Sequence, residues 1–571
     1  MSDLHRLAAE AGLMRCWTDA DGARQEVSDG SLRAILTALD LPAGTPEEIA
    51  RSRVSLHHRL DRLPAMITAD RNKPIPLPDR LHDAQLLDEA GHAVDIGMDS
   101  LRRSGLTEPG YYRLESAQGS IRIAIAPDRC PPIGRRCWGV AIQIPSLRGS
   151  GDFGDFGTLC EAVRLLGANG ADAVAISPVH ALDDPARFAP YSPSSRLALN
   201  ILFGEAEPIA AADGSDLIDW SKAGPAKLAA LRRTLGGDDA GLLQSHARRG
   251  LDAVQQAARE AGMAIGLIAD LAVGVDPGGS DARSDPAAFL QGLRIGAPPD
   301  PLGPRGQDWG LTGFSPLALV ERGFEPFIAM LRANMPVGGG IRIDHGFGLQ
   351  RLWVVPEGRA ASEGAYLRYP FDDLLRLVKL EAWRARAIVI AEDLGTRPAG
   401  FSAALEAAGI HGMAVLPFSR DEAGEFLPAA AYPARSVAMS GTHDTPTLAG
   451  WWTGRDLEWS RLLDRGGDSG ADRDQHRKAL WRAIGEATPM PAKDDPDMVI
   501  DRALAFLAGT PSSLLLVPME DMVGMIEQPN LPGTVDTHPN WRRRLPDRME
   551  KLLDRPDVSR RIDRLNRERG A

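Results

Sequence analysis

Cysteine is scarce in this chain of 571 residues. The four cysteines, Cys16, Cys130, Cys137 and Cys160, show neither the CxxC spacing of a zinc or redox site nor the density of a disulfide-stapled domain. We therefore expect reduced thiols in a cytoplasmic protein, without a disulfide or a zinc site. Aromatic residues make up only 5% of the sequence, so any aromatic binding surface must be built from a few side chains.

Long apolar runs and an excess of positive charge are also absent. No run of about 18 apolar residues occurs, so no transmembrane helix is expected. The first residues, MSDLHRLAAEAGLMRCW, lack the basic and then apolar pattern of a signal peptide. The net charge of −12 argues against nucleic acid and anionic membranes as partners.

Motifs for nucleotides and metals are missing as well. The pattern GxxxxGK[ST], which cradles the phosphates of nucleoside triphosphates, does not occur. The zinc-binding pattern HExxH and the pattern HxH are absent too. We therefore expect neither a metal nor another cofactor.

Short apolar strands alternate with amphipathic helices after about residue 135, which is typical of an α/β fold. Eight strands are predicted, at residues 137–145, 171–179, 264–273, 340–345, 387–394, 412–418, 436–444 and 513–521. Eight such units predict a TIM (β/α)8 barrel. The long stretches after the second, third and seventh strands would be insertions above the carboxyl-terminal rim. A doubly wound open sheet is the alternative architecture.

The first 130 residues have a different texture. Residues 1–57 predict a small helical region, in which Ser28 or Asp29 caps the second helix. Residues 58–130 predict a small β domain, because short alternating segments are separated by turns. The remaining residues, 131–571, would form the barrel with its inserted subdomains, after a proline-containing link.

Four of the predicted barrel strands end in an acid: Asp270, Asp344, Glu392 and Asp444. The carboxyl ends of barrel strands share one rim, so these acids would converge on one site. Arg342 would favour the ionised form of Asp344, although a structural ion pair is an equal reading. Convergent carboxylates suit glycoside cleavage by a nucleophile and a general acid/base. They also suit metal-dependent hydrolysis with His345 and His443, and spacing alone does not choose between the two.

Several sequence blocks that occur in a fixed order distinguish between glycoside cleavage and metal-dependent hydrolysis. The segments IRIDHGFGLQRLWVVPEG, GAYLRYPFDDLL, VIAEDLGTRP and GTHDTPTLAGWW resemble the amylomaltase family, the 4-α-glucanotransferases or disproportionating enzymes. Further blocks are similar to that family's first strand, substrate loop, lid segment and closing segment: GVAIQIPSLRGSGDFGDFGTL, PYSPSSRLALN, GAPPDPLGPRGQDWGLTGFSP and EQPNLPGTVDTHPNWRRRL. All fall in order over roughly residues 135–545, and the long N-terminal part suits the larger bacterial members.

The resemblance implies retaining transfer on α-1,4-glucans by double displacement. Segments would move between malto-oligosaccharides, or to glucose as acceptor. Asp344 would be the nucleophile, with Arg342 keeping it ionised and oriented. Glu392 would be the acid/base, with a pKa raised by burial and neighbouring carboxylates. Asp444 would be the third carboxylate, which grips ring hydroxyls.

The resemblance also implies further substrate contacts. His345 and His443 would hydrogen-bond hydroxyls of the same sugar, and Asp270 would complete the subsite or simply hold Arg342. The outer candidates lie on two loops: Tyr191, Ser192 and Ser194 on the substrate loop, and Asp300, Gln307 and Trp309 on the lid segment, where Trp309 would be an acceptor platform. Glu520 and Asp521, at the end of the eighth strand, are weaker candidates, and Asn540 and Trp541 are expected to be structural.

Two departures from the family pattern stand out. Gly346 and Phe347 stand where many family members carry an aromatic and a basic residue after the nucleophile, and we expect the two glycines, Gly346 and Gly348, to loosen that turn. The segment 271–286 lacks the family's tryptophan, which predicts an altered acceptor preference. Three rival functions remain: an α-1,4-glucan hydrolase with the same acids, a non-catalytic glucan-binding protein and a metal-dependent hydrolase.

Overall fold

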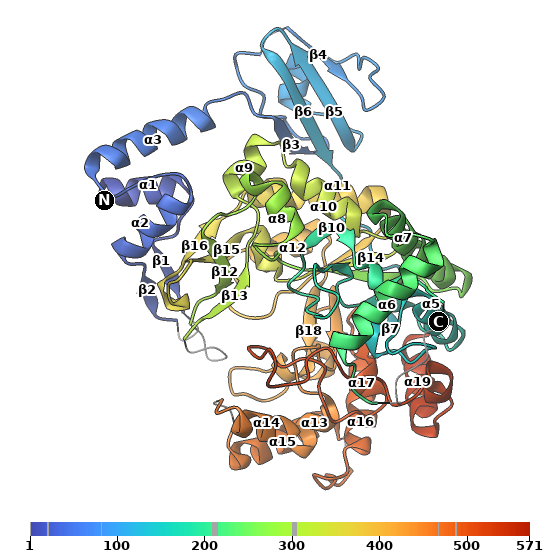
Figure 1. The fold of residues 1–571 in the computed structure, drawn as a ribbon. Coiled ribbons are helices and arrows are strands. Elements are labelled where there is room, and N and C mark those ends of the chain that lie inside the picture. The colour runs from blue at the N-terminus through green and yellow to red at the C-terminus, as the bar shows by residue number, and fades with distance from the viewer. Residues whose placement is uncertain are drawn as a thin grey trace.

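A closed barrel of eight parallel strands forms the centre of the computed structural model, which describes residues 2–19, 22–81, 83–207, 215–299, 305–465, 468–485 and 488–570 (Figure 1). The strands are β7 (Cys137–Ile142), β8 (Ala173–Ile176), β11 (Gly266–Leu271), β14 (Gly340–Ile343), β17 (Ile388–Ala391), β18 (Gly412–Val415), β19 (Ser436–Met439) and β20 (Leu514–Pro518). They follow one another as β17-β14-β11-β8-β7-β20-β19-β18. A parallel bridge between Ile390 and His411 closes the ring. The predicted barrel is confirmed, and the open-sheet alternative is wrong.

Apolar residues on both faces explain why these segments form barrel strands. Every residue of β11, β17, β19 and β20 is buried. Side chains such as Ile268, Val437 and Leu516 pack together inside the barrel. Side chains such as Trp138 and Leu515 pack outward beneath the helices. Both faces are therefore dry, and polar side chains can collect only at the strand ends.

Helices cover the outside of the barrel. They are α5 (Phe156–Ala168), α7 (Ala240–Glu260), α9 (Pro316–Glu321), α10 (Glu325–Asn334), α11 (Phe371–Ala385), α12 (Phe401–Ala408), α16 (Asp497–Ala508), α17 (Met519–Met522), α18 (Met549–Leu553) and α19 (Pro556–Arg569). Asp155 starts α5, because its carboxylate accepts a hydrogen bond from the backbone N–H of Thr158 at 3.0 Å. Within the described ranges, no helix is long and apolar enough to cross a bilayer.

Insertions build up the side of the barrel that carries the strand ends. A four-stranded antiparallel sheet has the order β13-β12-β15-β16, with β12 (Leu293–Ala297), β13 (Gln307–Leu311), β15 (Arg351–Pro356) and β16 (Ala365–Arg368). The other insertions are β9 (His180–Ala181), β10 (Ser195–Leu199), α6 (Trp220–Leu235), α8 (Ser280–Ser284), α13 (Leu448–Thr453), α14 (Arg455–Leu462) and α15 (Gly470–Ile484). The sequence predicted insertions here but not the antiparallel sheet, which joins segments more than 40 residues apart.

The N-terminal part contains two units. The first holds α1 (Asp3–Glu10), α2 (Asp29–Ala38) and α3 (Pro46–Leu60) with the hairpin β1 (Cys16–Thr18) and β2 (Arg24–Glu26). The second is a sheet of order β3-β6-β5-β4, with β3 (Met66–Asp70), β4 (Ala84–Leu87), β5 (Gly110–Ser116), β6 (Gly119–Ala126) and the helix α4 (Met98–Ser104). This sheet lies at one end of the molecule, and α13–α15 lie at the other (Figure 1). Helix α3 runs across the predicted boundary at residue 57, and the division into three domains stays a prediction.

Charged groups join the N-terminal sheet to barrel helix α11. Asp70 at the end of β3 accepts from Lys379 Nζ at 2.5 Å and from Arg376 Nε at 3.0 Å. Tyr111 on β5 donates its hydroxyl hydrogen to Glu381 Oε1 at 2.5 Å. These contacts fix the sheet against the outside of the barrel, away from the strand ends that carry the predicted acids.

The last turn of α19 ties the opposite end of the barrel together. The buried guanidinium of Arg569 donates to the backbone oxygens of Leu507, Ala508, Thr510, Ser512 and Cys137 at 2.8–3.2 Å. Burial lowers the pKa of Arg569 to about 10, so the side chain stays charged at neutral pH. One side chain therefore satisfies carbonyls at the end of α16 and at the start of β7.

Candidate active site

The predicted acids do lie at the carboxyl ends of the barrel strands. Asp270 and Arg342 belong to β11 and β14, Asp344 directly follows β14, Glu392 follows β17, and His443 and Asp444 follow β19. Strands β11, β14 and β17 are neighbours in the barrel, and Asp270 is paired in register with Arg342. The fold thus gathers these side chains at one rim.

Arg342 links two of the carboxylates. Its Nη1 atom is 2.7 Å from Asp270 Oδ1 and 3.0 Å from Asp344 Oδ1. Burial lowers the pKa of Arg342, but Asp270 and Asp344 raise it more, and the result lies well above the usual range. The guanidinium is therefore a fixed positive charge between the two carboxylates. Burial raises the pKa of Asp270, and Arg342 opposes this rise. Arg342 therefore does two things: it orients Asp344, and it forms a structural ion pair with Asp270.

Glu392 lies in surroundings that favour its protonated form. Burial raises the pKa of Glu392 to about 7; Arg342 opposes this rise, and Asp344 adds to it. Backbone N–H groups hold both carboxyl oxygens, because His345 donates to Oε2 at 3.0 Å and Leu394 donates to Oε1 at 2.8 Å. The raised pKa expected from the sequence is confirmed, and the group is poised to give or take a proton near neutral pH.

The turn after Asp344 is tight. His345 has a left-handed backbone conformation, with φ of 45° and ψ of 60°. The N–H of Gly346 donates to the carbonyl oxygen of Glu392 at 2.7 Å, and a Cβ at residue 346 would lie only 2.9 Å from that oxygen. The expectation that Gly346 loosens the turn is wrong, because the absent side chain permits close packing against β17.

Tyr191 connects Asp270 to His443. Its hydroxyl donates to Asp270 Oδ2 at 2.5 Å and lies 3.2 Å from His443 Nδ1, while the two rings stack with centroids 4.5 Å apart. Burial raises the pKa of Tyr191 well above the usual range, and Asp270 adds to this effect. Tyr191 therefore stays a neutral donor. Its predicted contact with the donor sugar stays a prediction.

His443 continues this chain of contacts to Asp444. Its Nε2 atom lies 3.3 Å from Asp444 Oδ2. Burial lowers the pKa of His443, but Asp444 raises it more, so the net pKa lies above the usual value. Burial raises the pKa of Asp444, but His443 and Asn530 lower it more, so Asp444 is ionised at neutral pH. The carboxylate is 47% exposed and opens toward solvent.

Asn530 and Trp541 are two site residues that sequence reasoning missed. Asn530 Nδ2 donates to Asp444 Oδ1 at 2.6 Å. The ring of Trp541 lies 5.3 Å from that of His443 and 5.7 Å from that of Tyr191. Both residues belong to the closing block EQPNLPGTVDTHPNWRRRL, which was the one available signal. Trp541 was expected to be structural, but the structure packs it against the site.

The remaining predicted substrate contacts, on the substrate loop and the lid segment, differ in their surroundings. Ser194 is buried, its hydroxyl donates to Asp183, and it lies 2.9 Å from Ser280 Oγ, so it organises the substrate loop. Trp309 packs edge-on against His345 at 5.1 Å and donates to Gln307 Oε1 at 3.1 Å. Ser192 lies on the same loop as Tyr191, and its backbone N–H bonds to Ala189. Asp300 lies outside the described residues.

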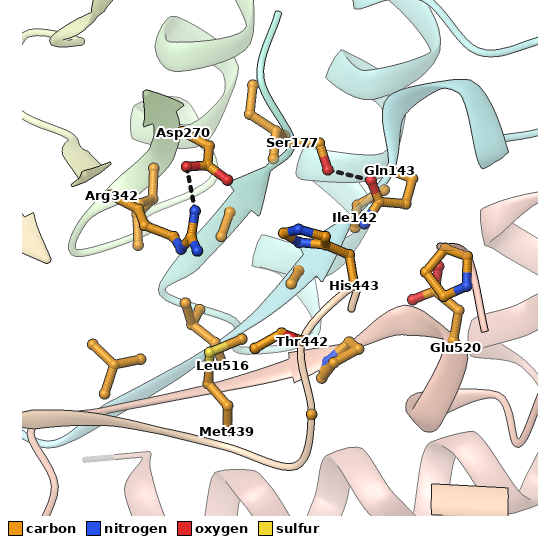
Figure 2. A pocket seen from close by; sticks show the side chains of 18 of the residues that line it. Ile142, Gln143, Ser177, Asp270, Arg342, Met439, Thr442, His443, Leu516 and Glu520 are labelled. Atoms are coloured by element: carbon orange, nitrogen blue, oxygen red, sulfur yellow. Dashed lines mark hydrogen bonds and ion pairs between the residues drawn. The ribbon is translucent and has the colours of Figure 1, made fainter. Parts of the chain in front are cut away.

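A chamber extends from the site into the barrel. Its upper wall is formed by Asp270, Arg342 and His443, and its lower wall by apolar barrel side chains such as Met439 and Leu516 (Figure 2). The polar side chains of Gln143, Ser177, Thr442 and Glu520 also line it. Gln143 and Ser177 are hydrogen-bonded to each other.

Metal ligation finds no support in this arrangement. In the part of the chain that the structure describes, no group of three or more His, Cys, Asp and Glu side chains could hold a metal ion. The carboxylates are held instead by Arg342, Tyr191, His443 and backbone N–H groups. Such partners suit an acid/base and nucleophile pair.

Comparisons with known proteins agree with this chemistry. The profile of the 4-alpha-glucanotransferases, glycoside hydrolase family 77, matches residues 142–241 and 238–550. The 4-alpha-glucanotransferase of Haemophilus influenzae is 31% identical over 76% of this chain and 80% of its own length. That of Mycobacterium bovis is 29% identical over 96% of this chain and 95% of its own.

Solved structures extend the agreement to the whole fold. The amylomaltase of Corynebacterium glutamicum superposes with a TM-score of 0.90 and 26% identity, covering all of both chains. The amylomaltase of Streptococcus agalactiae, solved with acarbose, covers 76% of this chain with a TM-score of 0.61 and 18% identity, which shows a common fold. The sequence profile, the curated relatives and the folded barrel with its carboxylates together establish that this chain belongs to the 4-alpha-glucanotransferase family, glycoside hydrolase family 77.

Proposed function

We propose that Asp344, Glu392 and Asp444 carry out the family's retaining transfer of α-1,4-glucan segments in this protein. The observation that supports this most is the contrast between two acids at neighbouring strand ends. Asp344 is paired with the fixed charge of Arg342, whereas burial raises the pKa of Glu392 to about 7. One acid is thus suited to attack and the other to proton transfer.

The first half-reaction forms a covalent intermediate. An oxygen of the Asp344 carboxylate attacks the anomeric carbon of the donor sugar while the glycosidic bond to the departing segment breaks. Glu392 gives its proton to the departing oxygen. The products are a glucosyl ester on Asp344 and a shortened glucan with a free hydroxyl.

The second half-reaction reverses these roles. The hydroxyl of an acceptor sugar gives its proton to the Glu392 carboxylate and attacks the anomeric carbon, and the ester bond to Asp344 breaks. Two inversions at one carbon retain the configuration. Asp444, ionised and open to solvent, would hold ring hydroxyls of the reacting sugar.

Malto-oligosaccharides are the donors that we propose, with malto-oligosaccharides or glucose as acceptors. His345, His443 and Trp309 would line the sugar path. A cytoplasmic location is also part of the proposal, since the four cysteines are free thiols and none forms a disulfide.

Incubation with maltotriose tests the proposal. The purified protein, without metal or nucleotide, should produce glucose and a ladder of longer maltodextrins. Asp344→Ala and Glu392→Gln should each lower the rate by at least about a thousandfold. Glu425→Gln is the control, since Glu425 is an exposed partner of Arg482 on the surface.

Hydrolysis is the alternative outcome of the same experiment, since water and sugar compete for one ester. Glucose and maltose without longer products would show that water wins, and the transfer proposal would be wrong. Full activity of Glu392→Gln would contradict the acid/base assignment, whatever the products are.

A further inference from the structure

Glu520 is a buried acid that the proposed reaction does not use. It lies in the first turn of α17, directly after β20, and is 5% exposed. Among the described residues, no hydrogen bond or ion pair joins its carboxyl group to another side chain. Its neighbour Asp521 is different, because it accepts from Ser440 Oγ at 2.5 Å and from the N–H of Leu448 at 2.7 Å. Asp521 has a structural role, which leaves Glu520 to be explained.

The surroundings of Glu520 tie it to the site. Its side chain lines the same chamber as His443, Asp270 and Arg342 (Figure 2). Burial raises the pKa of Glu520 to about 7; its own backbone N–H opposes this rise, Asp521 adds to it, and His443 opposes it. From the helix behind, Arg561 donates to the carbonyl oxygen of Met522 and acts on Asp521. Glu520 therefore changes from neutral to charged near neutral pH.

The donors on His443 are already committed. Tyr191 uses its hydroxyl hydrogen for Asp270, so it can only accept a hydrogen bond from Nδ1–H of His443. The contact of Nε2 with Asp444 needs a second N–H. Both nitrogens carry hydrogen at once, and His443 is an imidazolium, in agreement with its raised pKa. An ionised Glu520 in the same chamber would be a third acceptor for His443, whose two donors are already in use.

We propose that Glu520 is a positioning residue of the transfer reaction: protonated, it leaves His443 bound to Tyr191 and Asp444, and ionised, it competes with Asp444 for His443. The inference rests on the proposed function of Asp444 and Glu392. Loss of activity at alkaline pH then has two causes. Glu392 loses the proton that it must give to the departing oxygen. Glu520 becomes an anion that draws His443 away from Asp444.

The pH dependence of kcat/KM on maltotriose tests this. Glu392 and Glu520 both titrate near pH 7, so log kcat/KM of the wild-type protein should fall at alkaline pH with a limiting slope of about −2 per pH unit. In Glu520→Gln only Glu392 remains of the two, and the limiting slope should be about −1. The variant should be about tenfold more active at pH 8, relative to its own value at pH 6, than the wild type. Asp521→Asn is the matched control: it should lower stability and keep the steep limb.

A second readout follows His443 directly. In protein labelled with 15N-histidine, the imidazole signals of His443 are those that vanish in His443→Gln. As Glu520 ionises near pH 7, these signals should shift in the wild-type protein while both nitrogens of His443 still carry hydrogen, and Glu520→Gln should lack this shift. This measurement needs no turnover, so it tests Glu520 even if maltotriose yields no longer products and the proposed function fails.

Four results would overturn the inference. The first is a wild-type limb with a slope of −1, which needs no variant and thus no folded mutant. The second is an unchanged limb in Glu520→Gln, and the third is a shift of the imidazolium signals of His443 that persists in that variant. The fourth is a flattened limb in Asp521→Asn, which would assign the effect to Asp521.

Discussion

Tyr191→Phe removes one hydroxyl group and should break the link between Asp270 and His443 in the site. The substitution keeps the ring that stacks on His443 and deletes the oxygen that joins Asp270 to His443. Asp270 would then be held by Arg342 alone, and Nδ1 of His443 would lose its acceptor. The volume of the side chain hardly changes, so the effect should come from the lost hydrogen bonds.

The contacts set the size of the effect. The bond to the buried Asp270 carboxylate is 2.5 Å long, and hydrogen bonds to charged groups contribute about 1.5–3 kcal/mol. The contact with His443 is longer, at 3.2 Å, and adds about 0.5–1 kcal/mol. If the loss of the two contacts raises the activation free energy by about 2–3 kcal/mol, kcat/KM falls roughly 30- to 150-fold.

Tyr111→Phe is the matched control. Its hydroxyl also donates to a buried carboxylate at 2.5 Å, that of Glu381, but it lies at the N-terminal sheet. Both variants should lower the free energy of unfolding by about 1–3 kcal/mol. Only Tyr191→Phe should lower the initial rate of glucose release from maltotriose at pH 6. Equal losses of activity in the two variants, or a Tyr191→Phe rate within twofold of the wild type, would refute the reasoning.

Three further predictions concern stability and a second contact of the site. The pKa of Glu520 is about 7 in the folded state, above its value of about 4.5 in the unfolded chain, so the carboxyl group destabilises the fold as pH rises between these values. The free energy of unfolding of Glu520→Gln in urea should therefore exceed that of the wild type by about 3 kcal/mol at pH 8 and equal it at pH 4. Asn530→Ala removes the 2.6 Å bond to the half-exposed Asp444 and should lower kcat/KM about fivefold in the maltotriose assay, whereas an unchanged value would exclude a role for Asn530 in holding Asp444. Asp70→Asn leaves Lys379 without its carboxylate and should lower the free energy of unfolding in denaturant by about 1–3 kcal/mol at pH 7, with no change in activity. Burial raises the pKa of Asp70, but Lys379 and Arg376 lower it more, so this difference should be lost as pH falls through that lowered pKa.

The barrel and its acids could be predicted because their signals are local. Each strand is a short apolar run, and Asp344 and Glu392 follow directly after two such runs. Parallel strands of one barrel share a rim, so strand ends that are far apart in the sequence meet without further information. The raised pKa of Glu392 followed from the resemblance to the family, which implies an acid/base that is buried near other carboxylates.

The partners of these acids could not be predicted in the same way. Asn530 reaches Asp444 from a loop 86 residues later in the chain, and no periodicity points to such a contact. Tyr191 was placed on the correct loop, but its orientation depends on where Asp270 and His443 meet. Gly346 was misread because a glycine in a turn signals either slack or close approach, and only the neighbouring strand decides between them.

The guanidinium of Arg569 has a consequence for the order in which the protein can be completed during synthesis. It binds the carbonyl oxygen of Cys137, which leaves the ribosome more than 430 residues earlier. Until Arg569 emerges, the carbonyl oxygens of Ser512 and Cys137 lack this partner, and backbone hydrogen bonds alone join the first and last barrel strands at that end. The last contacts at this end of the barrel therefore form only after α19 has left the ribosome.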